Sequence, residues 1–320
     1  MLAFGHRSVH AAACDGPSEC CAGQIVHGAP MRSVALGVAI LGLSNINERA
    51  GTWDADYYLM EEWSAAPGFT PQTEIVNELS RLGTQYDTTL LVDGHCSRSR
   101  RIRSTLRATY NLRRFPFDHQ ELAIEISDDE FPASELRYLD TPSALGFEDA
   151  ARETLSSWKI ECDPVLTHVV QAFRWERGTP EYDNASVTFG VRRHVTFHLF
   201  KYFLPLFVIV ALAFSVFWID PDELGAPATI GITCLLAAIA FQFAEASTLP
   251  EVSYLTLADR VYVVCYVAIG AALFETITAN ALARRGERER ALRIDGWCRC
   301  LFPVGTLIAL AASIVRAFTQ

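Results

Sequence analysis

Two threonine hydroxyls lie where they could contact water or ions, in the segment APATIGITCLLAAIAFQF at residues 226–243. At about 100° per residue, six side chains of a helix here fall within about 40° of one line. They are Thr229, Thr233, Leu236, Ala240, Phe243 and Ser247. The hydroxyls could bind water or ions, and the apolar residues could close a water-filled path by dewetting. The alternative is a packing face, because small residues and threonines also mediate tight helix contacts.

One helix cannot enclose a pore, so the pore interpretation requires several copies of the chain around an axis. Asp222 and Glu223 directly precede the segment and would then form carboxylate rings at its mouth. No lysine or arginine lies along the line of six side chains.

The segment belongs to a hydrophobic half of the chain. Four stretches there approach the roughly 20 residues that cross a hydrocarbon core. They are residues 199–219, 226–243, 260–282 and 297–318. Buried helices of a soluble protein are the alternative, and four such stretches in succession argue against them. The sequence therefore predicts a multi-pass membrane protein in contact with a lipid bilayer.

Arginines between the third and fourth stretches set the predicted orientation. Short loops rich in lysine and arginine stay in the cytoplasm. The five arginines of this loop are Arg284, Arg285, Arg288, Arg290 and Arg293. The N-terminal half and the C-terminus are then expected outside the cell (inner) membrane.

The first half is polar and predicts β-structure. TWDADYYLMEEW, residues 52–63, alternates apolar and polar side chains with the period of a strand. Further strand-like segments predict an immunoglobulin-like β-sandwich. They lie at residues 103–110, 121–127, 156–162, 166–175 and 185–197. Residues 34–43 fit either a further strand or, after Met31 and Arg32, the apolar part of a short signal sequence. The expected organisation is a disordered extension (1–32), an extracytoplasmic sandwich (33–197) and an all-α four-helix transmembrane domain (198–320).

Several other functions find no support. The net charge of −10 argues against a nucleic-acid partner, because phosphate binding needs basic clusters. The histidines and the nine cysteines lack metal-ligand spacing, and no phosphate loop or nucleophile elbow is present. Carboxylates such as Glu61 and Glu62 are more typical of solvated strand ends than of an acid–base pair. We expect no enzyme activity, no cofactor and no metal.

A short motif between two predicted strands stands apart. In FPFDHQ, residues 115–120, a proline lies between two phenylalanines and an aspartate follows. Proline fixes φ and favours a tight turn, cis or trans, which the phenylalanines could seat against an apolar surface. Asp118 could simply balance the two preceding arginines, or it could meet a basic partner elsewhere.

Together these features resemble the pentameric ligand-gated ion channels, and their bacterial branch in particular. The likeness covers about residues 33–320. FPFDHQ matches a membrane-facing loop of the family, and Arg193 with Pro205 matches the start of its first membrane helix. The remaining matches are Trp218, GIT (231–233) with Leu236, LPEVSYLT (249–256) and SNINERAGTWDADYYL (44–59). Because the last of these is similar to the family's first two strands, the resemblance favours a strand at residues 34–43.

The resemblance implies a homopentamer in which a small-molecule agonist or protons act on the outer domain and inorganic ions pass. Trp175 and Tyr182, near the family's capping loop, are the candidate ligand residues. Glu223 and the line from Thr229 to Ser247 would line the pore. The gating signal would pass through a third set, in which Asp118 is expected to pair with Arg193. These coupling residues are Phe115, Pro116, Phe117, Asp118, Arg193, Leu249 and Pro250.

Departures from the family pattern refine these expectations. Ala108 and Leu122 stand where animal relatives carry a pair of cysteines, so the loop is expected to lack their disulfide. Anion-selective relatives carry an arginine where this chain has Pro227, so with Glu223 nearby the resemblance favours cations. A different class stays open, a non-conducting membrane-anchored receptor or binding module built on the same fold.

Overall fold

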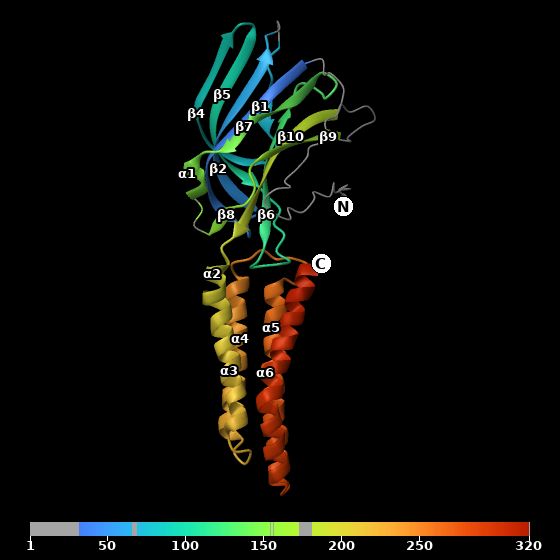
Figure 1. Ribbon diagram of the computed structural model, residues 1–320. Coiled ribbons are helices and arrows are strands. Elements are labelled where there is room, and N and C mark those ends of the chain that lie inside the picture. The colour runs from blue at the N-terminus through green and yellow to red at the C-terminus, as the bar shows by residue number, and fades with distance from the viewer. Residues whose placement is uncertain (1–31, 66–68, 154, 156, 173–180, 320) are drawn as a thin grey trace. The chain divides into compact units, whose positions relative to one another are not determined.

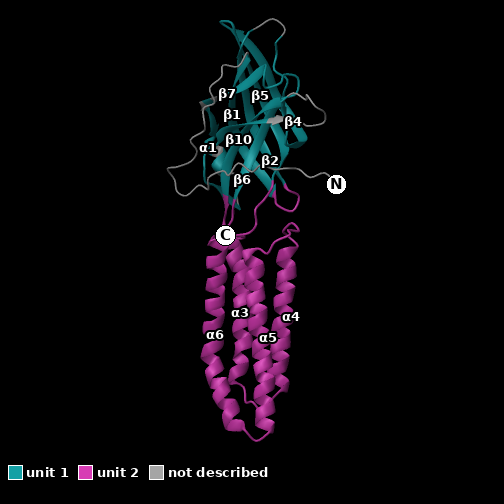
Figure 2. Ribbon diagram, turned by 90° about the vertical axis from the view of Figure 1, so that its right-hand side faces the viewer, with its two compact units in different colours: residues 1–46, 52–108, 120–191 teal, residues 47–51, 109–119, 192–320 magenta. Residues whose placement is uncertain are grey.

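The computed structural model describes residues 32–65, 69–153, 155, 157–172 and 181–319. The chain divides into two compact units, coloured separately in Figure 2. The sandwich unit runs to Ile46 and continues over residues 52–108 and 120–191. The helical unit contains residues 192–320 together with the short segments 47–51 and 109–119. Of the expected extension at residues 1–32, all but Arg32 lies outside the described residues.

The sandwich unit consists of two five-stranded sheets, whose strands are labelled in Figure 1 except for the short β3. The first sheet has the order β4-β5-β2-β1-β7, and the second has β3-β6-β10-β8 with β9 beside β10. The strands are β1 (Arg32–Asn47), β2 (Thr52–Ser64), β3 (Thr73–Ile75), β4 (Glu78–Val92), β5 (His95–Arg107), β6 (His119–Asp128), β7 (Leu136–Phe147), β8 (Trp158–Ile160), β9 (Val165–Ala172) and β10 (Glu181–Arg193). One short helix, α1 (Asp149–Glu153), follows β7.

The core of this unit lies between the two sheets. Along β2 every second side chain from Trp53 onward is buried, as the alternation in the sequence predicts. The ring of Trp53, from the first sheet, meets the ring of Phe189, from the second, edge to face at 5.6 Å between centroids. Phe147 of β7 meets the same ring at 5.1 Å. The predicted fold class, a β-sandwich followed by four helices, is confirmed.

Two long strands were not expected from the sequence. The residues of β4 are exposed or half-buried throughout, so the strand carries no buried alternation that a sequence pattern could reveal. It is held by antiparallel pairing with β5 through a tight turn at Asp93 and Gly94, both at positive φ. Strand β7 pairs in parallel with β1, about a hundred residues earlier in the chain. Such a distant partner leaves no local signal.

The helical unit contains four apolar segments long enough to cross a membrane. The first, residues 195–218, joins α2 (Val195–His198), a π-helical turn (Leu199–Phe203), α3 (Leu204–Phe214) and a 3-10 turn (Ser215–Trp218). The others are α4 (Gly225–Ala246), α5 (Leu257–Arg284) and α6 (Arg288–Thr319). Pro205 lies in the first turn of α3, where the missing N–H costs little.

The basic segment before the fourth span is mostly helical, not a loop. Helix α6 begins at Arg288, nine residues before the predicted start, so only residues 285–287 connect α5 and α6. Arginine, glutamate and alanine all favour helix, and Arg290 pairs with Glu287 at 2.6 Å. The arginines used to orient the chain therefore occupy the ends of two helices and the turn between them.

Candidate functional site

The line of side chains predicted on α4 is exposed in the single chain. Glu223, just before the helix, and all six residues from Thr229 to Ser247 are accessible. Leu236 is 66% exposed and Phe243 is 73% exposed, although both are large and apolar. None of the described residues covers this face, so its apolar side chains require another partner.

A different face of α4 packs against the neighbouring helix. Gly231, Cys234 and Ala238 are buried there. A Cβ added at Gly231 would lie 3.1 Å from Cδ1 of Leu273 on α5, so the two backbones approach closely. Tyr266 of α5 reaches α4 as well, and its hydroxyl donates to Oε1 of Gln242 at 2.6 Å. The packing interpretation of the threonine line therefore fails within one chain.

The hydroxyl of Thr229 donates to the carbonyl oxygen of Gly225, one turn earlier, at 2.8 Å. This bond back to its own helix uses the hydroxyl hydrogen and leaves the oxygen lone pairs facing outward. Thr229 can therefore still accept a hydrogen bond from water at the start of α4.

Carboxylates precede α4, as expected, but they differ in their surroundings. Asp220 and Asp222 are paired with Arg288 of α6 at 2.6 and 3.4 Å. Glu223 is exposed and has no ion-pair partner among the described residues. Glu223 is therefore the carboxylate here whose charge is uncompensated.

The FPFD turn belongs to the helical unit. Its Phe115–Pro116 peptide bond is cis. Phe115 is fully buried, and its ring meets that of His198 on α2 at 5.0 Å. Phe117 is 42% exposed and lies 6.4 Å from the ring of Phe318, near the end of α6. One phenylalanine therefore anchors the turn on the first span, and the other lies beside the last.

Asp118 makes the expected contact with Arg193. Nε and Nη2 of Arg193 donate to the two carboxylate oxygens at 2.9 and 3.1 Å. The Arg193 guanidinium also lies 2.7 Å from Oε1 of Glu48 and over the ring of Phe115 at 4.9 Å. Burial acts to lower the pKa of Arg193, but the bonds and charges of Asp118 and Glu48 outweigh it and raise that pKa. The arginine therefore stays charged while buried.

The same loop contacts the linker that joins α4 to α5. The backbone N–H of Leu112 donates to the hydroxyl of Tyr254 at 2.9 Å. The N–H of Leu257, at the start of α5, donates to the carbonyl oxygen of Arg113 at 3.0 Å, and the Arg113 guanidinium lies over the Tyr254 ring at 4.6 Å. From the segment 47–51, Arg49 donates to the carbonyl oxygen of Ser247 at 2.9 Å. Both short segments therefore bind the C-terminal end of α4 or the linker beyond it.

Three residues that make these contacts were not predicted from the sequence: Glu48, Arg49 and Tyr254. The first two lie in a turn that was noted only as part of a strand pair, and Tyr254 lies within the LPEVSYLT motif. Leu249 and Pro250, the linker residues that were named instead, are half-buried. No local signal singles out Glu48, because its partner is far away in the chain.

The structure describes one of the two candidate ligand residues. Trp175 lies outside the described residues. Tyr182 is half-buried at the start of β10, opposite Gln171 of β9 in the antiparallel register. Their role in binding stays a prediction. In the part of the chain that the structure describes, no three histidine, cysteine, aspartate or glutamate side chains are grouped so that they could hold a metal ion.

Comparison with known proteins supports the assignment of the membrane region. The model of the neurotransmitter-gated ion-channel transmembrane region matches residues 202–303. The match begins in the first span, includes α4 and α5, and ends inside α6.

Relatives named as receptors or channels extend the likeness into the sandwich unit. The gamma-aminobutyric acid receptor subunit beta of Caenorhabditis elegans is 32% identical over 193 residues, 59% of this chain and 33% of the relative. The pH-sensitive chloride channel 2 of Anopheles gambiae is 27% identical over 235 residues, 71% of this chain and 38% of that one. The human gamma-aminobutyric acid receptor subunit rho-2 is 24% identical over 302 residues, 85% of this chain and 63% of the relative.

The chain spans less than two thirds of the length of each of these relatives. The bacterial branch within the superfamily stays a prediction. The matched family is one of ion channels, not enzymes, and its members are integral membrane proteins. The membrane-region match, the ordered motifs and the sandwich joined to four spans agree: together they support a pentameric ligand-gated ion channel of the Cys-loop superfamily.

Proposed function

We propose that this chain is a subunit of a homopentameric ligand-gated ion channel whose pore is lined by α4. One observation carries the proposal: the line from Thr229 to Ser247 is exposed along the whole of an apolar helix. Lipid would not explain its threonines, and intrachain packing uses another face. A ring of chains around a common axis turns this line toward water and gives Leu236 and Phe243 neighbours of their own kind.

Gating requires a connection between the outer domain and α4. Both short segments, 47–51 and 109–119, contact Arg193 just before the first span. The segment 109–119 also binds Tyr254 of the linker between α4 and α5. A change in the sandwich that displaces either segment would move the outer end of α4. Asp118 and Arg193 are the proposed centre of this connection, with Phe115, Pro116 and Phe117 as its rigid frame. Leu249 and Pro250 carry the movement along the linker.

The proposed stimulus is a small-molecule agonist or protons, acting at the outer domain near Trp175 and Tyr182. Support comes from the relatives, which are named for gamma-aminobutyric acid and for pH sensitivity. These two probes are therefore the first to apply.

The charge of the permeant ion has two candidates. Cations are favoured by this chain itself, because Glu223 is exposed and uncompensated and α4 carries no lysine or arginine. Anions are favoured by the relatives named as chloride channels. We propose cation passage, because the residues at the pore mouth carry negative charge.

The test is a recording from the purified protein in planar bilayers, with gamma-aminobutyric acid or a step of outer pH as stimulus. Current with a reversal potential that follows sodium across a sodium chloride gradient supports the proposal in full. A reversal potential that follows chloride keeps the channel and replaces the selectivity. A pentamer on gel filtration that passes no current under either stimulus indicates a non-conducting receptor.

A further inference from the structure

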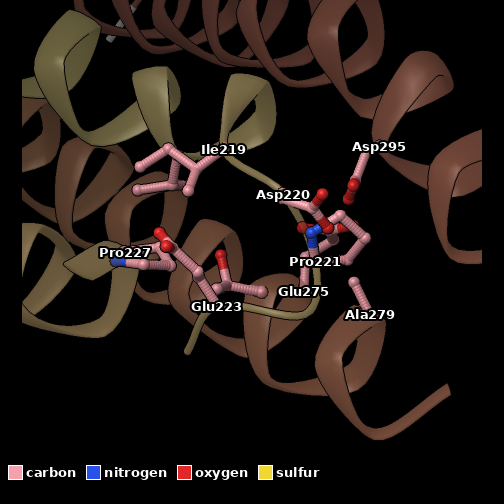
Figure 3. Close-up of a pocket in the computed structure, with 10 residues that line it drawn as sticks. Ile219, Asp220, Pro221, Glu223, Pro227, Glu275, Ala279 and Asp295 are labelled. Carbon is pink, nitrogen blue, oxygen red and sulfur yellow. The ribbon is translucent and has the colours of Figure 1, made fainter. Parts of the chain in front are cut away.

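Two carboxylic acids face one another inside the helical unit, at the end opposite the FPFD turn. Glu275 of α5 is 8% exposed and Asp295 of α6 is 4% exposed. Their side chains are hydrogen-bonded to each other. Figure 3 shows both in the wall of a small cavity beside the turn of Asp220 and Pro221. No channel element described above requires acids at this place.

The cavity has room for about one water molecule. Its interior is about 10 Å³, which is close to the smallest space that holds a water. Oε1 of Glu275 is buried and has no hydrogen-bond partner among the described residues. An unpartnered carboxyl oxygen in a polar, water-sized cavity is a position that a water hydrogen or an acid proton would satisfy.

The two arginines near the pair have partners of their own. Nε of Arg299 donates to the carbonyl oxygen of Phe217 at 3.0 Å, and Arg288 binds Asp220 at 2.6 Å. The titratable and charged groups beside the pair, from α6 and the turn before α4, are Asp220, Glu223, Cys298 and Arg299. Arg288 lies beside Asp220.

Two hydrogen-bonded carboxyl groups cannot both be ionised in such a place. Like charges at hydrogen-bond distance repel, and the hydrogen bond itself needs one proton between them. Arg299 lies near Asp295, but one guanidinium offsets one carboxylate only. With one proton between them, one of the two carboxyl groups donates the hydrogen bond and the other accepts it. The pair of Glu275 and Asp295 then carries a single negative charge.

The turn beside this pair leads directly into α4. Nδ2 of Asn280, on α5, donates to the carbonyl oxygen of Pro221 at 2.7 Å. Glu223 and Pro227, which precede and begin α4, line the same cavity. If α5 and α6 separate at the acid pair, the turn that leads into α4 would therefore move as well.

We propose that Glu275 and Asp295 form a binding site for one proton and one water molecule at the cytoplasmic end of the helices, and that loss of the proton regulates the pore from inside. Without the proton the carboxylates repel, α5 and α6 separate, and the Pro221 turn shifts. The proton site stands on the geometry alone, whereas its effect on current rests on the proposed channel function.

The site itself is tested by infrared spectroscopy of the full-length protein in liposomes. At neutral pH the wild-type protein should show the carbonyl absorption of a protonated carboxylic acid. Glu275→Gln and Asp295→Asn should each remove or shift this absorption, whereas Glu62→Gln, at an exposed carboxylate of β2, should leave it unchanged. Absence of the absorption in the wild-type protein, or its unchanged presence in Glu275→Gln, overturns the proposal.

Regulation is tested in excised membrane patches at constant outer pH. Raising the cytoplasmic pH should change the wild-type current about fivefold or more, which corresponds to a coupling of about 1 kcal/mol. Glu275→Gln, with an amide fixed in the neutral form, should not respond to cytoplasmic pH but should keep its response to the outer stimulus. If the wild-type current does not change with cytoplasmic pH, the regulatory role of the acid pair is overturned. Absence of any current, with the infrared signal present, leaves the proton site in place and rejects the channel function.

Discussion

Arg193 donates two hydrogen bonds to Asp118, of 2.9 and 3.1 Å, although the two residues are 75 positions apart in the chain. Both side chains are buried, at 5% and 1% exposure. The pair ties the loop between β5 and β6 to the start of the first span, and Glu48 adds the segment between β1 and β2. Three stretches that are distant in the chain thus meet at one guanidinium.

Asp118→Asn should abolish gating while the pentamer still assembles. The amide keeps the size and one acceptor but removes the charge, and breaking a buried ion pair costs about 3–5 kcal/mol. The measurements are stimulus-evoked current and gel filtration of the same preparation. Asp129→Asn, at an exposed aspartate, is the matched control and should behave as wild type. Full gating in Asp118→Asn would remove this pair from the mechanism.

The double variant Asp118→Asn, Arg193→Gln measures the interaction energy between the two side chains, separately from the destabilisation that each substitution causes on its own. If the pair acts as a unit, the loss of thermal stability in the double variant should be smaller than the sum of the two single losses. Additive losses would mean that the two residues act independently.

Leu236→Ser should let ions leak without a stimulus. Leu236 is proposed to form an apolar constriction, and a hydroxyl in its place would hydrate the closed pore. We expect basal flux from liposomes to rise about tenfold, equivalent to about 1.4 kcal/mol in the closed-to-open equilibrium. Leu235→Ser changes the neighbouring, half-buried leucine about 100° around the helix, and should give a much smaller leak. Equal leaks from both variants would argue against a gate at Leu236.

Cysteines placed on two faces of α4 should differ in reactivity. Thr233→Cys lies on the exposed line, whereas Ala238 is fully buried against α5. A membrane-impermeant thiol reagent should therefore modify position 233 and spare position 238, as read by peptide mass spectrometry at each site. If position 233 is protected in the assembled protein, the line faces another subunit or lipid and not water.

Acid should weaken the sandwich unit partly through Asp56. Hydrogen bonds from Arg101 (3.1 and 3.0 Å) and from Arg103 (2.8 Å) lower the pKa of this carboxyl, although partial burial opposes them. A lowered pKa in the folded state means that the contribution to stability is present above the unfolded pKa and is lost as pH falls through the folded one.

Asp56→Asn should therefore unfold at a lower temperature than wild type at neutral pH, and the difference should shrink below about pH 4. Thermal unfolding followed over this pH range gives the comparison, with Glu62→Gln at an exposed carboxylate as control. A difference that stays constant down to acid pH would exclude Asp56 as the source.

Much of the architecture could be predicted because its causes are local. Alternation along β2 and the apolar lengths of the four spans follow from side chains a few residues apart, and the structure agrees with both. The line on α4 could be predicted for the same reason, since helical periodicity alone brings Thr229, Thr233 and Leu236 to one face.

Other features have causes that lie far away in the chain. Strand β4 is recognisable only by its pairing with β5, and Glu48 matters only because Arg193 lies beside it. The apolar lengths indicated the spans, but they did not predict that α6 begins at Arg288, where the interruption is a three-residue turn.

Short-range periodicity and ordered motifs were enough to predict the two-part organisation, the four spans, the α4 line and the resemblance to ligand-gated channels. The folded chain was needed to show which face of α4 is left uncovered, that Asp118 and Glu48 share one buried contact with Arg193, and that Glu275 lies beside Asp295. Those outcomes depend on packing between segments tens to hundreds of residues apart. Local pattern carries the period of a helix or a strand, but it does not carry the partner that the chain brings to it.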